Sequence, residues 1–199
     1  ADKIVLAGDH WQLPPTVLSR EAAALGFNVS ILERAISKTS NVILLNTQYR
    51  MRQAIAGFSS HYFYTNLLHT AEHLQNTGVH LTFIDTAGSG YNEKHGPDGS
   101  SLQNEGELTI VQKIMETETL DPLTTAFISP YAGQVSAAKE LLPKQLRIST
   151  IDSFQGQERD IIYISMTRSN NDNRIGFLSE IRRMNVAMTR AKMKLVIIG

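Results

Sequence analysis

The sequence contains no cysteine, so it forms neither a disulfide nor a thiolate metal site. None of its apolar runs approaches the roughly 20 residues that a membrane-spanning helix needs, and no signal-peptide pattern stands at its beginning. Its 19 Lys and Arg balance its 19 Asp and Glu, which argues against a strongly basic coat for nucleic acid. We therefore expect no membrane partner and take the cytoplasm as the default location, with the nucleus as the alternative in a eukaryote.

The chain also lacks the common patterns that bind phosphate and metal. No Gly-x-x-x-x-Gly-Lys-Ser/Thr occurs anywhere, and no Gly-x-Gly-x-x-Gly opens after an expected strand, which counts against a dehydrogenase. No Asp-Glu pair stands at a strand end to hold magnesium. His69 and His73 lie four apart without a third ligand, so we predict no metal site. A complete site for phosphoryl transfer is thus absent.

What the 199 residues do contain is a repeated alternation of strands and helices. With 42% hydrophobic residues, the chain is long enough for one good core. Short apolar runs predict strands at residues 1–8, 42–45, 79–85, 125–128, 147–150, 161–168 and 195–198. Helical patterns separate most of these runs, which predicts an α/β fold with a mostly parallel sheet and helices on both faces.

Local signals place some of the helix ends. Ser30 with Glu33 three residues later predicts a capping box, and Asn104 with Glu107 predicts another helix start. Residues 86–101 are rich in Gly, Ser, Asn and Pro, have no periodic pattern and predict a mobile loop.

The most informative stretch runs over residues 149–168. Its first part is polar and carries Gly156 and Glu158, and its second part is an apolar run that suits a strand buried on both faces. Gly156 can adopt backbone angles that other residues avoid and lets a ligand approach the main chain. A polar loop that leads into a buried strand is a common way to hold chemistry on a rigid frame.

Several other polar residues are candidates for phosphate binding. Arg50 stands at a predicted strand-to-helix junction, where its fork suits phosphate, although an ordinary ion pair is also consistent with it. Gln12 follows the first predicted strand and suits either a phosphate contact or a surface amide. Arg183 and Arg190 are seven apart in a helix expected over residues 180–192, so they share a face.

Four ordered segments together resemble motifs of superfamily 1 helicases, in the branch that contains the RNA-surveillance helicase of nonsense-mediated decay. They are Gly8-Asp9-His10-Trp11-Gln12-Leu13-Pro14-Pro15, Gln48-Tyr49-Arg50-Met51, the stretch over residues 149–168, and Arg183-Met184-Asn185-Val186-Ala187-Met188-Thr189-Arg190-Ala191. The resemblance implies a RecA-like fold in which two domains face each other with the nucleotide between them. Residues 1–40 resemble the tail of the first domain, which carries the third motif, and residues 41–199 resemble the second domain.

The resemblance also implies roles for individual residues. Gln12 corresponds to the glutamine that senses the terminal phosphate, Arg50 to a phosphate-binding arginine, and Arg190 to an arginine finger that acts in cis. The residues expected beside the nucleotide are Tyr49, which would stack on the base, Gly156 and Glu158. The implied cofactor is ATP with Mg²⁺, whose metal ligands are expected in the first domain.

A further segment, after the strand at residues 125–128, resembles the family's contact with the nucleic-acid backbone. The expected contact residues are Ser129, Pro130, Tyr131, Gln134 and Thr150. The region from Lys144 to Lys194 holds ten Lys and Arg against five Asp and Glu, which suits phosphates, although such charges can simply solvate helix faces. A packed turn with a satisfied tyrosine is an equally good interpretation of Tyr131.

The sequence therefore predicts the C-terminal half of an ATP-dependent helicase or translocase. Its expected partners are single-stranded DNA or RNA and the first RecA-like domain of the same parent chain, and the fragment alone is expected to be inactive. Two alternatives stay open: a non-catalytic nucleic-acid-binding module derived from a helicase, and a different nucleotide-dependent α/β enzyme.

Overall fold

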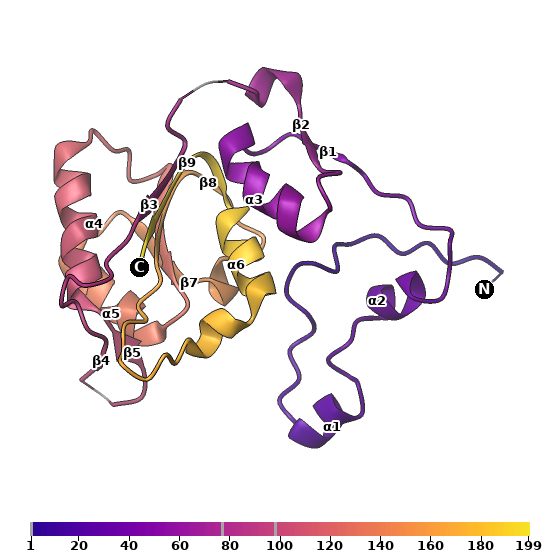
Figure 1. Cartoon of the computed structure of the whole chain (residues 1–199), viewed down its shortest axis with the longest axis horizontal. Coiled ribbons are helices and arrows are strands. Elements are labelled where there is room, and N and C mark those ends of the chain that lie inside the picture. Colours follow the sequence, from indigo (N-terminus) through magenta and orange to yellow (C-terminus); the bar gives the residue numbers. More distant parts are fainter. Residues whose placement is uncertain (1, 77, 98) are drawn as a thin grey trace.

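Five parallel strands form the central sheet of the computed structural model, which describes residues 2–76, 78–97 and 99–199 (Figure 1). In spatial order they are β3 (Leu81–Ile84), β9 (Ala191–Ile198), β8 (Arg159–Ser165), β6 (Thr125–Ser129) and β7 (Arg147–Thr150). The apolar runs predicted as strands buried on both faces therefore lie at the centre of the sheet, where neighbours cover them on every side.

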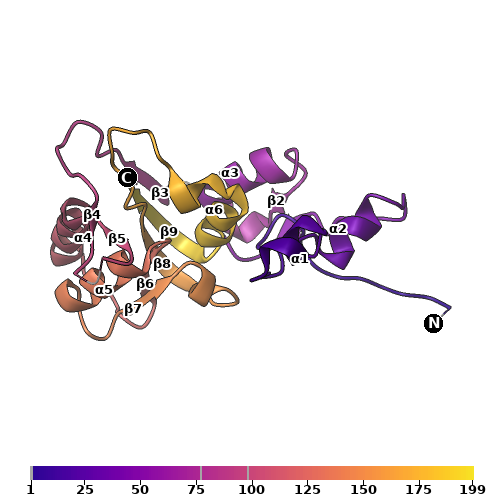
Figure 2. The ribbon, with the colours of Figure 1, turned by 90° about the horizontal axis from the view of Figure 1, so that it is seen from below.

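Helices cover both faces of this sheet (Figures 1 and 2). Alternate strand residues point to opposite faces, so Ile162 packs with α3 (Gln53–Phe63) and α6 (Ile181–Met188), whereas its neighbour Tyr163 belongs to the second core cluster. That second cluster is formed with α4 (Glu105–Thr117) and α5 (Ala132–Leu141). This arrangement confirms the predicted fold class, an α/β RecA-like domain with a mostly parallel sheet between helices.

The predicted helix starts are confirmed at atomic detail. The hydroxyl of Ser30 accepts a hydrogen bond from the Glu33 amide, and the Glu33 carboxylate accepts one from the Ser30 amide, which begins α2 (Ile31–Ile36). The side chain of Asn104 accepts a hydrogen bond from the Glu107 amide at the start of α4. Such caps satisfy amide groups that have no partner within the helix.

Two predicted strands do not form. Residues 2–46, the N-terminal arm, lie beside the sheet domain and carry only α2 and the short helix α1 (Arg20–Ala24) (Figures 1 and 2). Within the arm, the apolar runs at residues 4–7 and 42–45 are exposed, with Ile43 at 84%. A buried strand needs neighbouring strands, and no described residue pairs with either run. The domain boundary expected after residue 40 stays a prediction.

Two further predictions need correction. The last helix ends at Met188 rather than at residue 192, because Ala191 already pairs with Arg159 at the start of β9. Arg190 therefore lies in the connection after the helix and does not share a helix face with Arg183. The described residues of 86–101 form a loop as predicted, except that this loop contains a short strand, β4 (Lys94–His95), which pairs antiparallel with β5 (Leu102–Gln103).

Short elements complete the chain. A two-stranded parallel pair joins β1 (Thr47–Gln48) to β2 (His69–Thr70), and the 3-10 turns are η1 (Glu72–Leu74), η2 (Asp152–Phe154) and η3 (Gly176–Ser179). Across residues 2–76, 78–97 and 99–199, we find no helix with the length and apolar character needed to cross a membrane.

Candidate functional site

The amino ends of β8 and β9 bring together three of the predicted site residues, and we call this side of the sheet the amino edge. Arg50 comes from the loop before α3, and its Nε lies 2.6 Å from Oε2 of Glu158, the residue just before β8. The Arg50 Nη1 also donates to the carbonyl oxygen of Thr189 at 3.2 Å. Residues 108 positions apart in sequence therefore meet directly beside Arg190.

Arg190 is buried at this edge, with only 4% of its surface exposed. Its Nε donates to the Val186 carbonyl oxygen at 3.0 Å, and its Nη1 and Nη2 donate to the Gln157 carbonyl oxygen and the Thr189 hydroxyl. Burial lowers the pKa of Arg190, and the nearby charge of Arg50 lowers it further. The structure thus holds two like charges close together, one of them away from solvent.

The N-terminal arm contributes a fourth predicted residue to the amino edge. Gln12 donates from Nε2 to Oδ2 of Asp9 at 2.9 Å, and the same oxygen accepts a hydrogen bond from the hydroxyl of Tyr64 at 2.6 Å. The Asp9 charge acts on Arg190, since it opposes the lowering of the Arg190 pKa. Burial, followed by the contact with Asp9, raises the pKa of Tyr64. Sequence reasoning missed the roles of Asp9 and Tyr64, because nothing local links positions 55 residues apart.

Tyr49 and Gly156 differ from these residues in exposure and packing. The Tyr49 ring is 72% exposed and lies beside the His73 ring, with centroids 6.4 Å apart and planes inclined by 24°. Gly156 has φ +81°, and a Cβ placed on it would meet no atom within 4 Å. The left-handed backbone, rather than crowding, is therefore what favours glycine at this position.

The amino edge combines features that suit a phosphate-bearing ligand with an aromatic base. Guanidinium groups donate paired hydrogen bonds to phosphate oxygens, and an exposed aromatic ring offers a flat surface for a base. No group of three His, Asp or Glu side chains arranged to hold a metal ion occurs among the residues that the structure describes. His69 lies in β2 and His73 in η1, so the two do not share a helix face.

The candidate nucleic-acid residues lie at the other end of the strands from the amino edge. We call this side, formed by the carboxyl ends of the strands, the carboxyl edge. Ser129 and Gln134 are fully buried there. The Ser129 hydroxyl hydrogen-bonds the Thr167 hydroxyl at 3.0 Å, and Gln134 donates from Nε2 to the Ser165 hydroxyl at 2.7 Å. In this structure both side chains support the edge from beneath, whereas Pro130 is half-buried and closer to solvent.

The other two candidates at this edge also have internal partners. Tyr131 is only 4% exposed, and its hydroxyl accepts a hydrogen bond from the Phe177 amide at 3.2 Å. Thr150, half-buried, donates to the Ser153 hydroxyl at 2.9 Å and accepts from the Ser153 amide, which fixes the turn into η2. Contact between these residues and nucleic acid stays a prediction.

A buried glutamate organises the carboxyl edge. One Glu107 oxygen accepts hydrogen bonds from the Ser165 hydroxyl at 2.5 Å and the Thr167 amide at 2.9 Å, and the other accepts from Nδ2 of Asn104 at 3.2 Å. Burial raises the pKa of Glu107 to about 7, against the lowering effect of the Ser165 and Thr167 hydrogen bonds. The sequence indicated Glu107 only as a helix-start position, because its carboxylate partners lie about 60 residues away.

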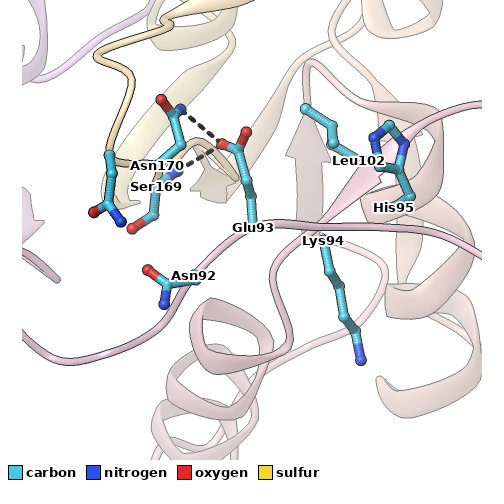
Figure 3. Close-up of a pocket in the computed structure, with 8 residues that line it drawn as sticks. Asn92, Glu93, Lys94, His95, Leu102, Ser169 and Asn170 are labelled. Atoms are coloured by element: carbon cyan, nitrogen blue, oxygen red, sulfur yellow. Dashed lines mark hydrogen bonds between the residues drawn. The ribbon is translucent and has the colours of Figure 1, made fainter.

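Glu93 anchors the loop that follows β8, as Figure 3 shows. One of its oxygens accepts hydrogen bonds from the Ser169 amide at 2.8 Å and the Asn170 side chain at 3.1 Å, and lies 3.0 Å from Nε of Arg168. Glu93, Ser169 and Asn170 border an open hollow of about 400 Å³ that Lys94 also lines. Part of the predicted mobile loop is therefore tied to the carboxyl edge.

Comparison with known proteins places these observations in context. A family described as the AAA domain matches residues 27–199. The chain is 37% identical over 220 residues to the DNA-binding protein SMUBP-2 of Mesocricetus auratus, an alignment that covers 100% of this chain and 22% of that protein. It is 35% identical over 222 residues to the Regulator of nonsense transcripts 1 homolog of Neurospora crassa, covering 99% of this chain and 20% of that protein.

A third relative comes from an archaeon. An uncharacterized ATP-dependent helicase of Methanocaldococcus jannaschii is 33% identical over 222 residues, covering 99% of this chain and 32% of that protein. The chain thus spans about a fifth to a third of the length of these relatives.

Proposed function

The chain belongs to the AAA domain family, in the RNA-surveillance branch of superfamily 1 helicases, and on that premise we propose that it forms one wall of an ATP cleft. In this proposal the amino edge faces the nucleotide and the carboxyl edge faces single-stranded nucleic acid. A first RecA-like domain of the same parent supplies the opposite wall. The parent is an ATP-dependent helicase or translocase, and the chain alone hydrolyses no ATP because it contains no phosphate loop.

The observation that carries this proposal is the pair formed by Arg50 and Arg190. Two guanidinium groups in mutual repulsion, one of them buried, favour an anion beside them, a place that the Glu158 carboxylate takes in this structure. When bound, ATP with Mg²⁺ supplies the phosphoryl group for transfer, and its metal ligands are expected in the first domain. Arg50 then neutralises phosphate charge while Glu158 orients the Arg50 guanidinium, and the exposed Tyr49 ring holds the base.

Arg190 needs a rearrangement before it contacts a phosphate. Three of its five N–H groups are engaged within the chain and only 4% of its surface is exposed, so the side chain has to become accessible before a phosphate reaches the remaining donors. The proposed role is to stabilise charge that develops during transfer, which raises turnover more than affinity. The same engagement favours the second candidate function, a nucleic-acid-binding module in which Arg190 is purely structural.

The test is ATP hydrolysis by the full-length parent, with and without single-stranded nucleic acid. We expect Arg190→Ala to lower kcat by about 10³- to 10⁵-fold with a small change in KM. Arg174→Ala is the matched control, because Arg174 is exposed and its side chain forms an ion pair with Asp172 at the surface. Normal kcat in Arg190→Ala would show that Arg190 is a structural residue. No hydrolysis by the wild-type parent would support the binding-module alternative, and hydrolysis by the chain alone would refute the claim that it is inactive.

A further inference from the structure

The residue that the sequence suggested for stacking on nucleic acid is not accessible. The Tyr131 ring lies beneath Arg168, whose Cζ is 5.9 Å from the ring centre, and beside the Phe177 ring at 5.4 Å. With its hydroxyl bonded to the Phe177 amide, Tyr131 serves as a support for the residues above it. A stacking surface at the carboxyl edge therefore has to come from another residue.

Phe177 presents such a surface. It lies in η3, and 57% of it is exposed. Its ring packs on Tyr131 on one side, and the Arg183 guanidinium lies 5.4 Å from the ring centre. Because Tyr131 follows β6 and Arg168 follows β8, the ring lies at the carboxyl edge beside the segment predicted to contact the backbone.

The ring is also held in place before any ligand binds. Arg183 donates from Nη1 to the Phe177 carbonyl oxygen at 3.2 Å and pairs through Nε with Asp152 at 3.1 Å, which links the ring to the turn after Thr150. Gly176, with φ +55°, lets the main chain approach the Tyr131 hydroxyl, since a Cβ there would lie 2.4 Å from that oxygen. A ring fixed in advance loses little entropy when a base stacks on it.

The charges around the ring indicate how the ligand is held. Arg168 pairs with Glu93, and Arg183 pairs with Asp152, so both guanidinium groups are largely neutralised. Attraction to phosphates at this spot is therefore weak, and the flat aromatic face is the main feature available to a ligand. An unpaired base offers the matching flat surface, whereas the bases of a duplex are already stacked.

We propose that Phe177 is a base-stacking residue for single-stranded nucleic acid, supported from beneath by Tyr131 and flanked by Arg168 and Arg183. This inference rests on the proposed function, because it assigns a further contact on the same strand-binding surface. Stacking tolerates any base, so the contact adds affinity without adding sequence preference.

The experiment measures binding of a fluorescent single-stranded oligonucleotide to the full-length parent. We expect Phe177→Ala to weaken the Kd by about 5- to 150-fold, which corresponds to about 1–3 kcal/mol per stacked base, and Phe177→Trp to keep the wild-type Kd. The slope of log Kd against log salt should stay the same in Phe177→Ala, since no phosphate contact is removed. Ile175→Ala is the matched control, because Ile175 is equally exposed at 57%, lies in the same loop and has no ring.

The outcomes separate this inference from the proposed function. If the wild type binds single strands and Phe177→Ala binds equally well, Phe177 does not stack, while the proposed function stands. If Ile175→Ala weakens binding as much as Phe177→Ala, the loop matters and the ring does not. If the wild-type parent binds no single strand, the proposed function fails and this inference fails with it. Thermal melting of each variant verifies that the fold is intact.

Discussion

Replacing Glu107 by glutamine tests the buried network at the carboxyl edge. Three donors converge on this carboxylate, from Asn104, Ser165 and Thr167. A glutamine has one amide nitrogen in place of an oxygen, so at least one donor would face another donor. A buried donor without an acceptor costs about 1–3 kcal/mol, which is the expected loss of unfolding free energy in Glu107→Gln at pH 5.

A second effect depends on pH. The folded chain keeps the Glu107 proton up to about pH 7, whereas the unfolded chain releases it near the ordinary pKa of 4.5. The stability that the protonated group contributes is therefore fully present below pH 4.5 and is lost as the pH rises through about 7. The difference between the Glu107 pKa of the folded chain and that of the unfolded chain, at about 1.4 kcal/mol per pKa unit, corresponds to about 3 kcal/mol of unfolding free energy.

Urea unfolding between pH 5 and pH 8 measures both effects. We expect the unfolding free energy of the wild type to fall by about 2–3 kcal/mol more than that of Glu107→Gln across this range. Glu116→Gln is the control, because Glu116 is exposed on the same helix and should leave the wild-type pH dependence unchanged. Parallel curves for the wild type and Glu107→Gln would show that Glu107 is already ionised throughout this range.

Two further predictions concern the amino edge and the support beneath Phe177. The exposed Tyr49 ring lies beside His73 and is free to stack on a base. Tyr49→Ala in the parent should therefore raise the KM for ATP with little change in kcat, as expected for a contact that is equal in ground and transition states. An unchanged KM in steady-state kinetics would contradict stacking. Gly176→Ala should lower the unfolding free energy clearly more than Gly88→Ala. Both substitutions place a side chain on a left-handed backbone, but only the Cβ at position 176 would clash with the Tyr131 hydroxyl. Equal losses in urea unfolding would rule out the clash.

The fold was predictable wherever local pattern and final environment agree. The apolar residues of β6 and β8 are continuous in sequence because those strands are covered on both faces. Asn104 begins α4 by accepting a hydrogen bond from an amide only three residues away. The runs at residues 4–7 and 42–45 carry the same local pattern but find no neighbouring strand. Pairing depends on distant residues, which a local pattern does not contain.

The candidate site shows the same division. Residue type and position indicated Arg50, and the family resemblance indicated Glu158, as groups expected beside the nucleotide, and the structure brings the two within 2.6 Å. The burial of Arg190 was not predictable, because the helix before it ends two residues earlier to allow β9 to begin. The burial of Tyr131 depends on Phe177, 46 positions along the chain, which no short pattern connects to it.

The length of β8 fixes the distance between the amino edge and the carboxyl edge. The strand runs from Arg159, next to Glu158, to Ser165, next to the Glu107 carboxylate, and at about 3.3 Å per residue its 7 residues span about 23 Å. One residue added to the regular part of β8 would turn Ser165 toward the wrong face, unless a bulge accommodates it, as the β8–β9 pairing does between Arg159 and Ile161. The distance between the amino edge and the carboxyl edge is therefore constant within the domain. If the parent moves along nucleic acid as we propose, each step has to come from movement of the domain as a whole.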